Sequence, residues 1–218
     1  MDAFQVIIDA LPFLLEGAWV TIQISVITII LATILGTPLA FMRLSANKLF
    51  RTLSTLYVWL LRGTPALVIL IFVFYAFPSI GIKLPAFTAA ILGLTLNAAA
   101  YKAEIIRSGI MAVPRAQTEA ALAVGMSDLK IARRVVLPQA ARIVVPPFIN
   151  NAILIVKNSA LVSVITVPDL MLNATQIYSS TFQAVAVFGT AGLIYLAMTS
   201  ALTLLQRWAE GRFALYSR

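Results

Sequence analysis

Residues 17–42 have the sequence GAWVTIQISVITIILATILGTPLAFM, in which no charged side chain occurs before Arg43 follows. A helix that crosses a bilayer needs roughly 20 mostly apolar residues, so this run is long enough to cross. The whole chain has the same character: its 218 residues are 61% hydrophobic and 11% charged, with a mean hydropathy of +0.97. A soluble domain of this length cannot bury so much apolar surface. The sequence therefore predicts an integral membrane protein.

Further apolar runs predict an all-α, polytopic fold with five transmembrane helices, at about residues 17–42, 53–77, 86–106, 143–165 and 184–205. The second is expected to start as an interfacial amphipathic helix and to kink at Gly63-Thr64-Pro65. Residues 2–15, which include Pro12, favour a short interfacial helix. Pro168 is suited to start a short surface helix. Residues 1–218 are predicted to form a single transmembrane domain, because the crossings leave few residues for a second one. Any catalytic domain is therefore expected on another chain.

Five crossings place the termini on opposite sides of the membrane, and the basic residues select the orientation. If the N-terminus is outside, Lys83 is the single basic residue in an outside loop. The cytoplasmic segments then hold most of the others: Arg43, Lys48, Arg51, Arg107, Arg115, Lys130, Arg133, Arg134, Arg142, Arg207, Arg212 and Arg218. The positive-inside rule therefore predicts an N-out, C-in protein. Phospholipid-facing loops explain the net charge of +8, and no nucleic-acid partner is expected.

The residue inventory excludes several kinds of chemistry. The chain has no cysteine and no histidine, which removes thiol nucleophiles, Ser-His pairs, zinc sites built on those ligands and histidine-ligated haem. No glycine is followed five residues later by another, so the phosphate-binding loop Gly-x-x-x-x-Gly-Lys is absent. No catalytic residue, metal or bound cofactor is therefore expected. Acidic residues at the start, Asp2, Asp9 and Glu16, argue against a signal peptide.

Residues 114–138, PRAQTEAALAVGMSDLKIARRVVLP, are too polar to cross a bilayer and predict an exposed loop with two short helices. Gly125 can adopt the left-handed conformation that ends the first helix. Ser127 is suited to cap the second helix, which is expected to stop at Pro138. Three alanines share one face of the first helix, namely Ala116, Ala120 and Ala123. This small, smooth face is suited to enter a groove on another protein.

The loop contains Glu-Ala-Ala, three residues, Gly, nine residues, a β-branched residue, one residue and Leu-Pro. The positions are Glu119, Ala120, Ala121, Gly125, Val135, Leu137 and Pro138. This pattern resembles the signature loop of permease subunits of prokaryotic type I ABC importers, with valine in place of the usual isoleucine.

The resemblance covers nearly the whole chain and is to the branch that takes up polar amino acids. It rests on Arg62-Gly63-Thr64-Pro65, Asn97 with Ala100-Tyr101, Ala103-Glu104-Ile105 and Leu137-Pro138-Gln139-Ala140. One run departs, because the branch usually has Lys-Asp-Thr-Ser-Leu where this chain has Lys157-Asn158-Ser159-Ala160-Leu161. The loss of a carboxylate and a hydroxyl leaves the substrate contact of this run open and favours an altered substrate preference.

The resemblance implies a transport subunit, not an enzyme, in the bacterial cytoplasmic (inner) membrane. A separate ATPase dimer, which holds ATP and Mg²⁺, would bind the loop through Glu119, Ala120, Ala121, Gly125, Leu137 and Pro138. An extracytoplasmic solute-binding protein would deliver the polar amino acid, which alternating access passes to the cytoplasm. Five crossings without a visible repeat are poorly suited to form both halves of such a path. A second permease subunit, identical or homologous, is therefore expected.

Polar groups at membrane depth are the candidates for the substrate path, because they are costly to leave in lipid. They are Asn97, Asn150, Asn151, Lys157, Asn158 and Ser159. Lys157 suits an α-carboxylate, and the asparagines can bind amino or carboxylate groups; hydrogen bonding between helices is the alternative. A second polar group lies nearer the cytoplasmic side, where snorkelling and ion pairing explain it: Arg62, Lys102, Glu104 and Arg107.

Two sets of small residues spaced four apart are suited to close helix contacts: Ala32, Gly36, Ala40 and Ala89, Gly93, Asn97. Packing within the chain and a seam between permease subunits both fit this pattern.

The alternative function is an ion-coupled secondary amino acid transporter. Such a protein usually needs a titratable relay within the membrane. The acidic residues are instead predicted outside, or at or beyond the cytoplasmic side: Asp2, Asp9, Glu16 and Asp169, and then Glu104, Glu119, Asp128 and Glu210. A membrane enzyme is disfavoured, because no paired intramembrane carboxylates or nucleophile-base pair occur.

Overall fold

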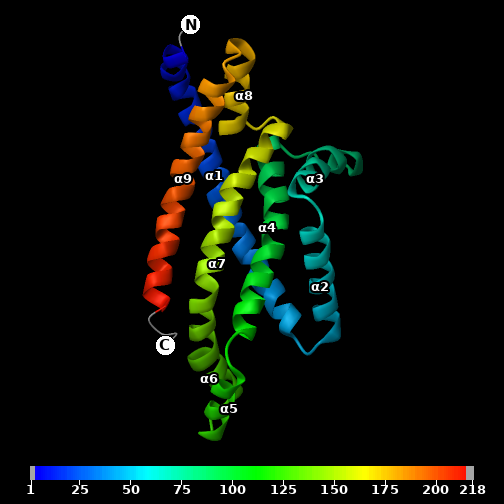
Figure 1. The fold of residues 1–218 in the computed structure, drawn as a ribbon. Coiled ribbons are helices and arrows are strands. Elements are labelled where there is room, and N and C mark those ends of the chain that lie inside the picture. Colours follow the sequence, from blue (N-terminus) through cyan, green and yellow to red (C-terminus); the bar gives the residue numbers. More distant parts are fainter. Residues whose placement is uncertain (1–2, 215–218) are drawn as a thin grey trace.

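The computed structural model describes residues 3–214, and every element in that range is a helix (Figure 1). The longest are α1 (Ala3–Leu44), α4 (Ala86–Met111), α7 (Leu137–Asn158) and α9 (Ala184–Ala214). The shorter ones are α2 (Lys48–Gly63), α3 (Ala66–Ile71), η1 (Phe72–Ala76), η2 (Phe77–Ile80), α5 (Arg115–Ala123), α6 (Asp128–Ile131), η3 (Ala132–Val136), η4 (Ser159–Ile165) and α8 (Leu170–Thr181). The all-helical prediction is confirmed.

Four helical segments of the described chain are long and apolar enough to cross a membrane: Phe4–Leu44, Ala86–Met111, Asp128–Ile165 and Ala184–Arg212. A fifth candidate is the pair formed by α2 and the segment Ala66–Ile80, which is bent by 103°. The bend falls at Gly63-Thr64-Pro65, as predicted. Thr64 has an extended backbone there, and Pro65 lacks the N–H that would continue the helical ladder.

The first helix is longer than predicted, because α1 continues through Pro12. The expectation of a separate interfacial helix over residues 2–15 is therefore wrong; its residue 2 lies outside the described chain. Val6, Ala10 and Leu14 are buried in a cluster with residues of α8 and α9. This burial offsets the one backbone hydrogen bond that a proline removes. The 42 residues of α1 extend about 63 Å at 1.5 Å per residue, well beyond a hydrocarbon core of roughly 30 Å.

The second loop helix does not stop at Pro138, contrary to the prediction. Instead α6, η3, α7 and η4 form one helical run, Asp128–Ile165. The five residues of η3 are π-helical, and the Leu137 N–H bonds back to the Ala132 carbonyl. This wider turn shifts the register of the ladder, so that Pro138 falls in the first turn of α7. No N–H donor is required from a residue in that position.

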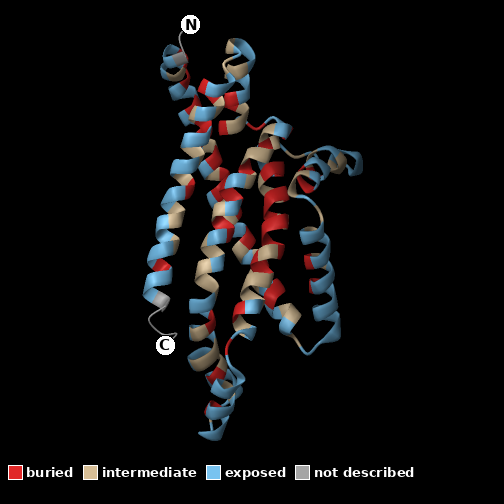
Figure 2. Ribbon diagram, in the orientation of Figure 1, coloured by how far each residue is buried: buried red, intermediate tan, exposed pale blue. Residues whose placement is uncertain are grey.

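Helix α4 lies at the centre of the bundle and is buried along much of its length (Figure 2). Helix α1 approaches it closely: a Cβ added to Gly36 would lie 2.9 Å from the Ala99 carbonyl oxygen. Ala32 and Ala40, one turn to either side of Gly36, are fully buried. On α4 itself, Gly93 packs against the backbone of Leu70 in α3. Both sets of small residues therefore serve helix packing within this chain.

Candidate functional site

The loop predicted to bind another protein lies at the end of the molecule opposite to α8 and the start of α1 (Figure 1). It turns at Gly125, which adopts a left-handed conformation with a φ of +76°. The N–H groups of Gly125 and Met126 bond to the carbonyls of Leu122 and Ala121, at 2.9 and 3.1 Å. These bonds satisfy carbonyls at the end of α5. Ser127 occupies the N-cap position of α6, although its side chain makes no capping hydrogen bond.

Most of the predicted coupling residues are exposed. Ala121 is buried, whereas the rest face solvent: Glu119, Ala120, Gly125, Leu137 and Pro138. The Glu119 carboxylate makes no hydrogen bond or ion pair with another residue of the described chain. Anchoring of the loop by contacts of Glu119 to its own subunit is therefore not seen among residues 3–214. Its carboxylate is available to a partner.

Large apolar side chains are also exposed at this end of the molecule. Leu122, Val124 and Leu129 expose 51%, 76% and 68% of their surface. Ala116 and Ala123 are exposed beside them on α5. Several large apolar side chains exposed on one protruding polar loop are suited to a protein contact.

The structure confirms the predicted ion pairing for two of the charged residues near the end of α4, Glu104 and Arg107. Glu104 forms an ion pair with Arg43 of α1 and another, at 2.5 Å, with Arg107 one turn further along α4. Arg62 lies over the ring of Tyr101, with its guanidinium carbon 5.2 Å from the ring centroid. Ion pairing thus explains Glu104 and Arg107, which tie α1 to the helix that leads into the loop.

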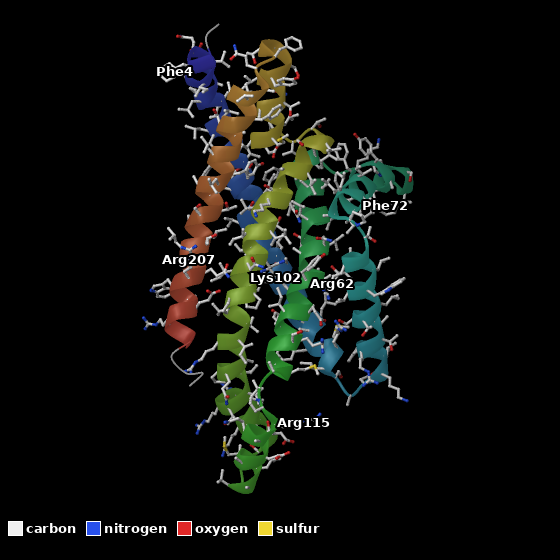
Figure 3. All side chains as sticks on the ribbon, viewed as in Figure 1. Phe4, Arg62, Phe72, Lys102, Arg115 and Arg207 are labelled. Carbon is white, nitrogen blue, oxygen red and sulfur yellow. The ribbon has the colours of Figure 1, made fainter. Side chains whose placement is uncertain are left out.

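The sequence prediction is wrong for Lys102, whose side chain neither snorkels nor forms an ion pair with any residue of the described chain. Its side chain is fully buried, and its Nζ has no hydrogen-bond partner among the described residues. The Nζ lies 3.2 Å from the centroid of the Phe148 ring of α7. Figure 3 shows Lys102 within the bundle. Packing of α4 between α1 and α7 leaves its side chain no route to the surface.

Three of the predicted path residues are buried: Asn97, Asn151 and Ser159. The Asn97 Nδ2 donates a hydrogen bond of 2.9 Å to the carbonyl of Leu61, close to the break after α2. The Ser159 Oγ donates to the Val156 carbonyl at 2.7 Å. For these two side chains the structure shows bonds within the chain. The Asn151 Oδ1 is buried without a partner in the described structure.

The remaining path residues are more accessible, since Asn150 and Lys157 are exposed and Asn158 is half-buried. Lys157 lines a groove of about 450 Å³ between α7 and α9. The other lining residues are Ile153, Leu196, Thr199, Ser200, Thr203, Leu204 and Arg207. Sequence reasoning missed the contribution of α9, although its polar residues recur at helical spacing along one face. Lys157 and Arg207 line the same groove, whereas Asn97 is not among its lining residues.

A buried polar junction at the opposite end of the molecule was also missed. Asp169, expected in an outside loop, is fully buried. Its Oδ1 accepts the N–H of Leu172 at 2.9 Å and caps α8, and its Oδ2 accepts the hydroxyl of Tyr195 at 3.4 Å. Burial raises the pKa of Asp169 to about 6, against the opposing effect of the Leu172 hydrogen bond. Gly17 makes the packing possible, because a Cβ there would lie 2.7 Å from the Asp169 carbonyl oxygen.

Comparison with known proteins agrees with this arrangement. Residues 29–215 match the family described as binding-protein-dependent transport system inner membrane component. The chain is 37% identical over 209 residues to the probable amino-acid ABC transporter permease protein YckA of Bacillus subtilis, an alignment that covers 96% of this chain and 92% of YckA. It is 39% identical over 218 residues to the nopaline transport system permease protein NocM of Agrobacterium fabrum, covering 94% and 90%.

A solved structure gives the same result. The chain superposes on a crystal structure of an amino acid ABC transporter with histidines with a TM-score of 0.92, at 33% identity and with 97% of this chain and 99% of that chain covered. The chain therefore belongs to the family of binding-protein-dependent transport system inner membrane components. It is a multi-pass membrane permease subunit of an ABC importer. The alternative of an ion-coupled secondary transporter receives no support.

Proposed function

We propose that this chain is the single transmembrane domain of an ATP-driven importer for a polar amino acid, with five crossings, an N-out, C-in orientation and a cytoplasmic coupling loop at residues 114–138. The observation that carries the proposal is the exposed loop, in which Gly125 ends α5 with a positive φ and the Glu119 carboxylate has no partner among residues 3–214. The fifth crossing is the bent pair of α2 and residues 66–80. Similarity to relatives named for amino acids and nopaline supports the substrate class.

The helical run Asp128–Ile165 connects the coupling loop to the groove. When a partner ATPase dimer closes on ATP and Mg²⁺, it displaces α5 and α6. A continuous helix transmits this displacement toward Lys157, and the π-helical turn at η3 supplies a place where the run can bend. Chemistry on the ATPase thereby reaches the substrate path without a catalytic group on this chain.

A second permease subunit, identical or homologous, covers the exposed polar face of α7. Asn150 and Lys157 lie on this face, and an amide or ammonium group facing lipid at membrane depth is costly. The substrate path then runs between the two subunits, with Asn150, Lys157 and Asn158 as contacts and with Asn97, Asn151 and Ser159 as supports. An extracytoplasmic binding protein delivers the amino acid at the end that holds α8.

The test is ATP-driven uptake by the reconstituted importer with Gly125→Ala. A left-handed conformation costs an alanine roughly 1 kcal/mol relative to glycine, so α5 shifts and uptake falls at least about fivefold while ATP hydrolysis continues. Gly211→Ala is the matched control, because both positions have open space around a new Cβ and only Gly125 has a positive φ. Uptake by the variant at the wild-type rate, or uptake on a proton gradient without an ATPase, would contradict the proposal.

A further inference from the structure

Lys102 is a buried amine that has no role in the proposed function. Its side chain is fully buried, and its Nζ has no hydrogen-bond partner among the described residues. The Nζ lies over the ring of Phe148 in α7, 3.2 Å from the centroid, but a phenyl face stabilises an ammonium only modestly. An amine without a hydrogen-bond partner is costly to bury in either protonation state. Lys102 therefore destabilises the packing of α4 on α7 that buries it.

The helices packed around Lys102 offer it no carboxylate. No Asp or Glu occurs in residues 17–103 or in residues 129–168, which include all of α2, α3 and α7 and most of α1. Glu104 is held by Arg43 and Arg107, and residues two apart on a helix do not face each other. Relief of the buried amine must come from water, which reaches Lys102 only if a neighbouring helix moves.

Helix α7 has a weak point beside Lys102. Pro146 and Pro147 lie inside the helix, directly before Phe148. Neither proline has an N–H, so two consecutive hydrogen bonds of the helical ladder cannot form, and helices bend at such positions. Residues 137–145, which precede the prolines, continue into η3 and the coupling loop. Bending at the prolines lets this segment move with the loop while the rest of α7 stays packed.

The segment 137–145 closes the cytoplasmic side of the space around Lys102. Helices α4 and α7 lie side by side and run in opposite directions (Figure 1). Gly109, two turns beyond Lys102 toward the loop, is buried against this segment. A Cβ added there would clash with the side chain of Val144 and lie 3.5 Å from the Ala140 carbonyl oxygen. Separation of Val144 from Gly109 would admit water from the cytoplasm toward the Lys102 amine.

We propose that Pro146-Pro147 is a hinge on which residues 137–145 swing away from α4 when the permease opens to the cytoplasm, and that hydration of the Lys102 amine favours this opening. The inference rests on the proposed importer function and adds a device that biases its conformations. In the closed packing the described chain offers Lys102 only the ring of Phe148, whereas water solvates the amine when the segment swings out. Lys102 thus makes the closed packing less stable than an apolar residue would.

The chain has no cysteine, so a single introduced thiol can report on the opening. Val144→Cys places this thiol in the contact with Gly109. Its rate of modification by a membrane-impermeant maleimide is measured in the purified complex with a cysteine-free ATPase, without nucleotide. Lys102→Met keeps the length of the side chain and removes the amine, so it should lower the rate at least about fivefold. Lys48→Met is the matched control, since Lys48 is exposed at the start of α2, and it should leave the rate unchanged.

The hinge is tested with the same thiol. Pro146→Ala combined with Pro147→Ala restores both N–H donors, so α7 should stiffen and the rate should again fall at least about fivefold. Each single proline substitution should lower the rate by a smaller factor. Pro38→Ala is the control, because Pro38 also lies inside a helix but is exposed on α1. A thiol introduced by Ile143→Cys, at an exposed position of α7, should react at one rate in all variants.

Two results would overturn the inference. A rate in Lys102→Met that equals or exceeds the parent rate, measured on a complex that elutes as a single species, would remove the role of Lys102. A parent rate in all the proline variants of α7 would remove the hinge. The proposed function fails separately, if the reconstituted importer with its binding protein and ATP takes up no labelled amino acid, because the modification rates do not depend on uptake.

Discussion

The junction around Asp169 and the coupling loop lie at opposite ends of the molecule and differ in the hydrogen bonding of their carboxylates and in the burial of their leucines. At the end that holds α8, Asp169 has partners for both carboxylate oxygens, and Leu170 beside it is fully buried. At the coupling loop, Glu119 has no partner within the described chain, and Leu122 exposes half of its surface. The junction around Asp169 is satisfied within one chain, whereas Glu119 at the coupling loop has no partner among the described residues. Substitutions at the two ends should therefore affect different measurements.

The largest effect on the free energy of unfolding is expected from a substitution at Gly17. A Cβ at this position would lie within 2.7–2.8 Å of backbone atoms of Asp169 and Leu170, and backbone cannot move aside as a flexible side chain can. Gly17→Ala should lower the free energy of unfolding by on the order of 3 kcal/mol. Thermal unfolding in detergent measures this loss. Gly189→Ala, where a Cβ meets nothing within 4 Å, is the control; equal stability of the two variants would show that the junction is not tightly packed.

A smaller effect on the free energy of unfolding is expected from the ionisation of Asp169. Because burial raises its pKa to about 6, the folded state binds the proton more tightly than the unfolded state does. The stability contributed by protonated Asp169 is therefore present at low pH, is lost as the pH rises from about 4 to about 6, and stays constant above that.

Asp169→Asn removes this pH dependence while keeping an oxygen that can cap α8. Above pH 6 the variant should be more stable than the wild type by about 2–3 kcal/mol, and below pH 4 the difference should vanish. Unfolding curves of both proteins from pH 4 to pH 7.5 provide the measurement. A stability difference that does not change with pH would mean that Asp169 is not titrating in this range.

The smallest effect on stability is expected at the coupling loop. Leu122→Ala should change the free energy of unfolding by less than about 0.5 kcal/mol, because the side chain is exposed. The same substitution at buried Leu170 should cost about 3 kcal/mol. Binding of the ATPase should respond in the opposite order, with an affinity loss of about tenfold for Leu122→Ala. Unchanged ATPase affinity in that variant would remove the apolar contact from the docking surface.

Sequence reasoning succeeded where a local rule acts alone. The kink at Gly63-Thr64-Pro65 follows from proline chemistry, and the turn at Gly125 follows from the freedom of glycine to take a positive φ. The same kind of rule failed at Pro12 and Pro138. There, burial of α1 against α8 and α9 and the π-helical turn at η3 allowed the helices to continue.

The candidate site shows the same limit. Lys157 was identified because a charge at membrane depth is visible in sequence, but the groove that it lines is completed by α9, where Arg207 lies 50 residues further along the chain. Asn97 and Ser159 were selected as polar groups at membrane depth and proved to bond within the chain. The sequence shows which residues are polar and not which way each one faces.

By itself, the sequence determined that this chain is a helical membrane protein with one exposed loop, because hydropathy and turn chemistry act over short stretches. It also determined the family resemblance, through the spacing of residues within that loop. Only the tertiary structure decided that Asp169 and Lys102 are buried, that the small residues of α1 pack on α4, and that Lys157 lines a groove together with residues of α9. These features depend on which helices become neighbours, and helix packing brings together residues that are far apart in the chain.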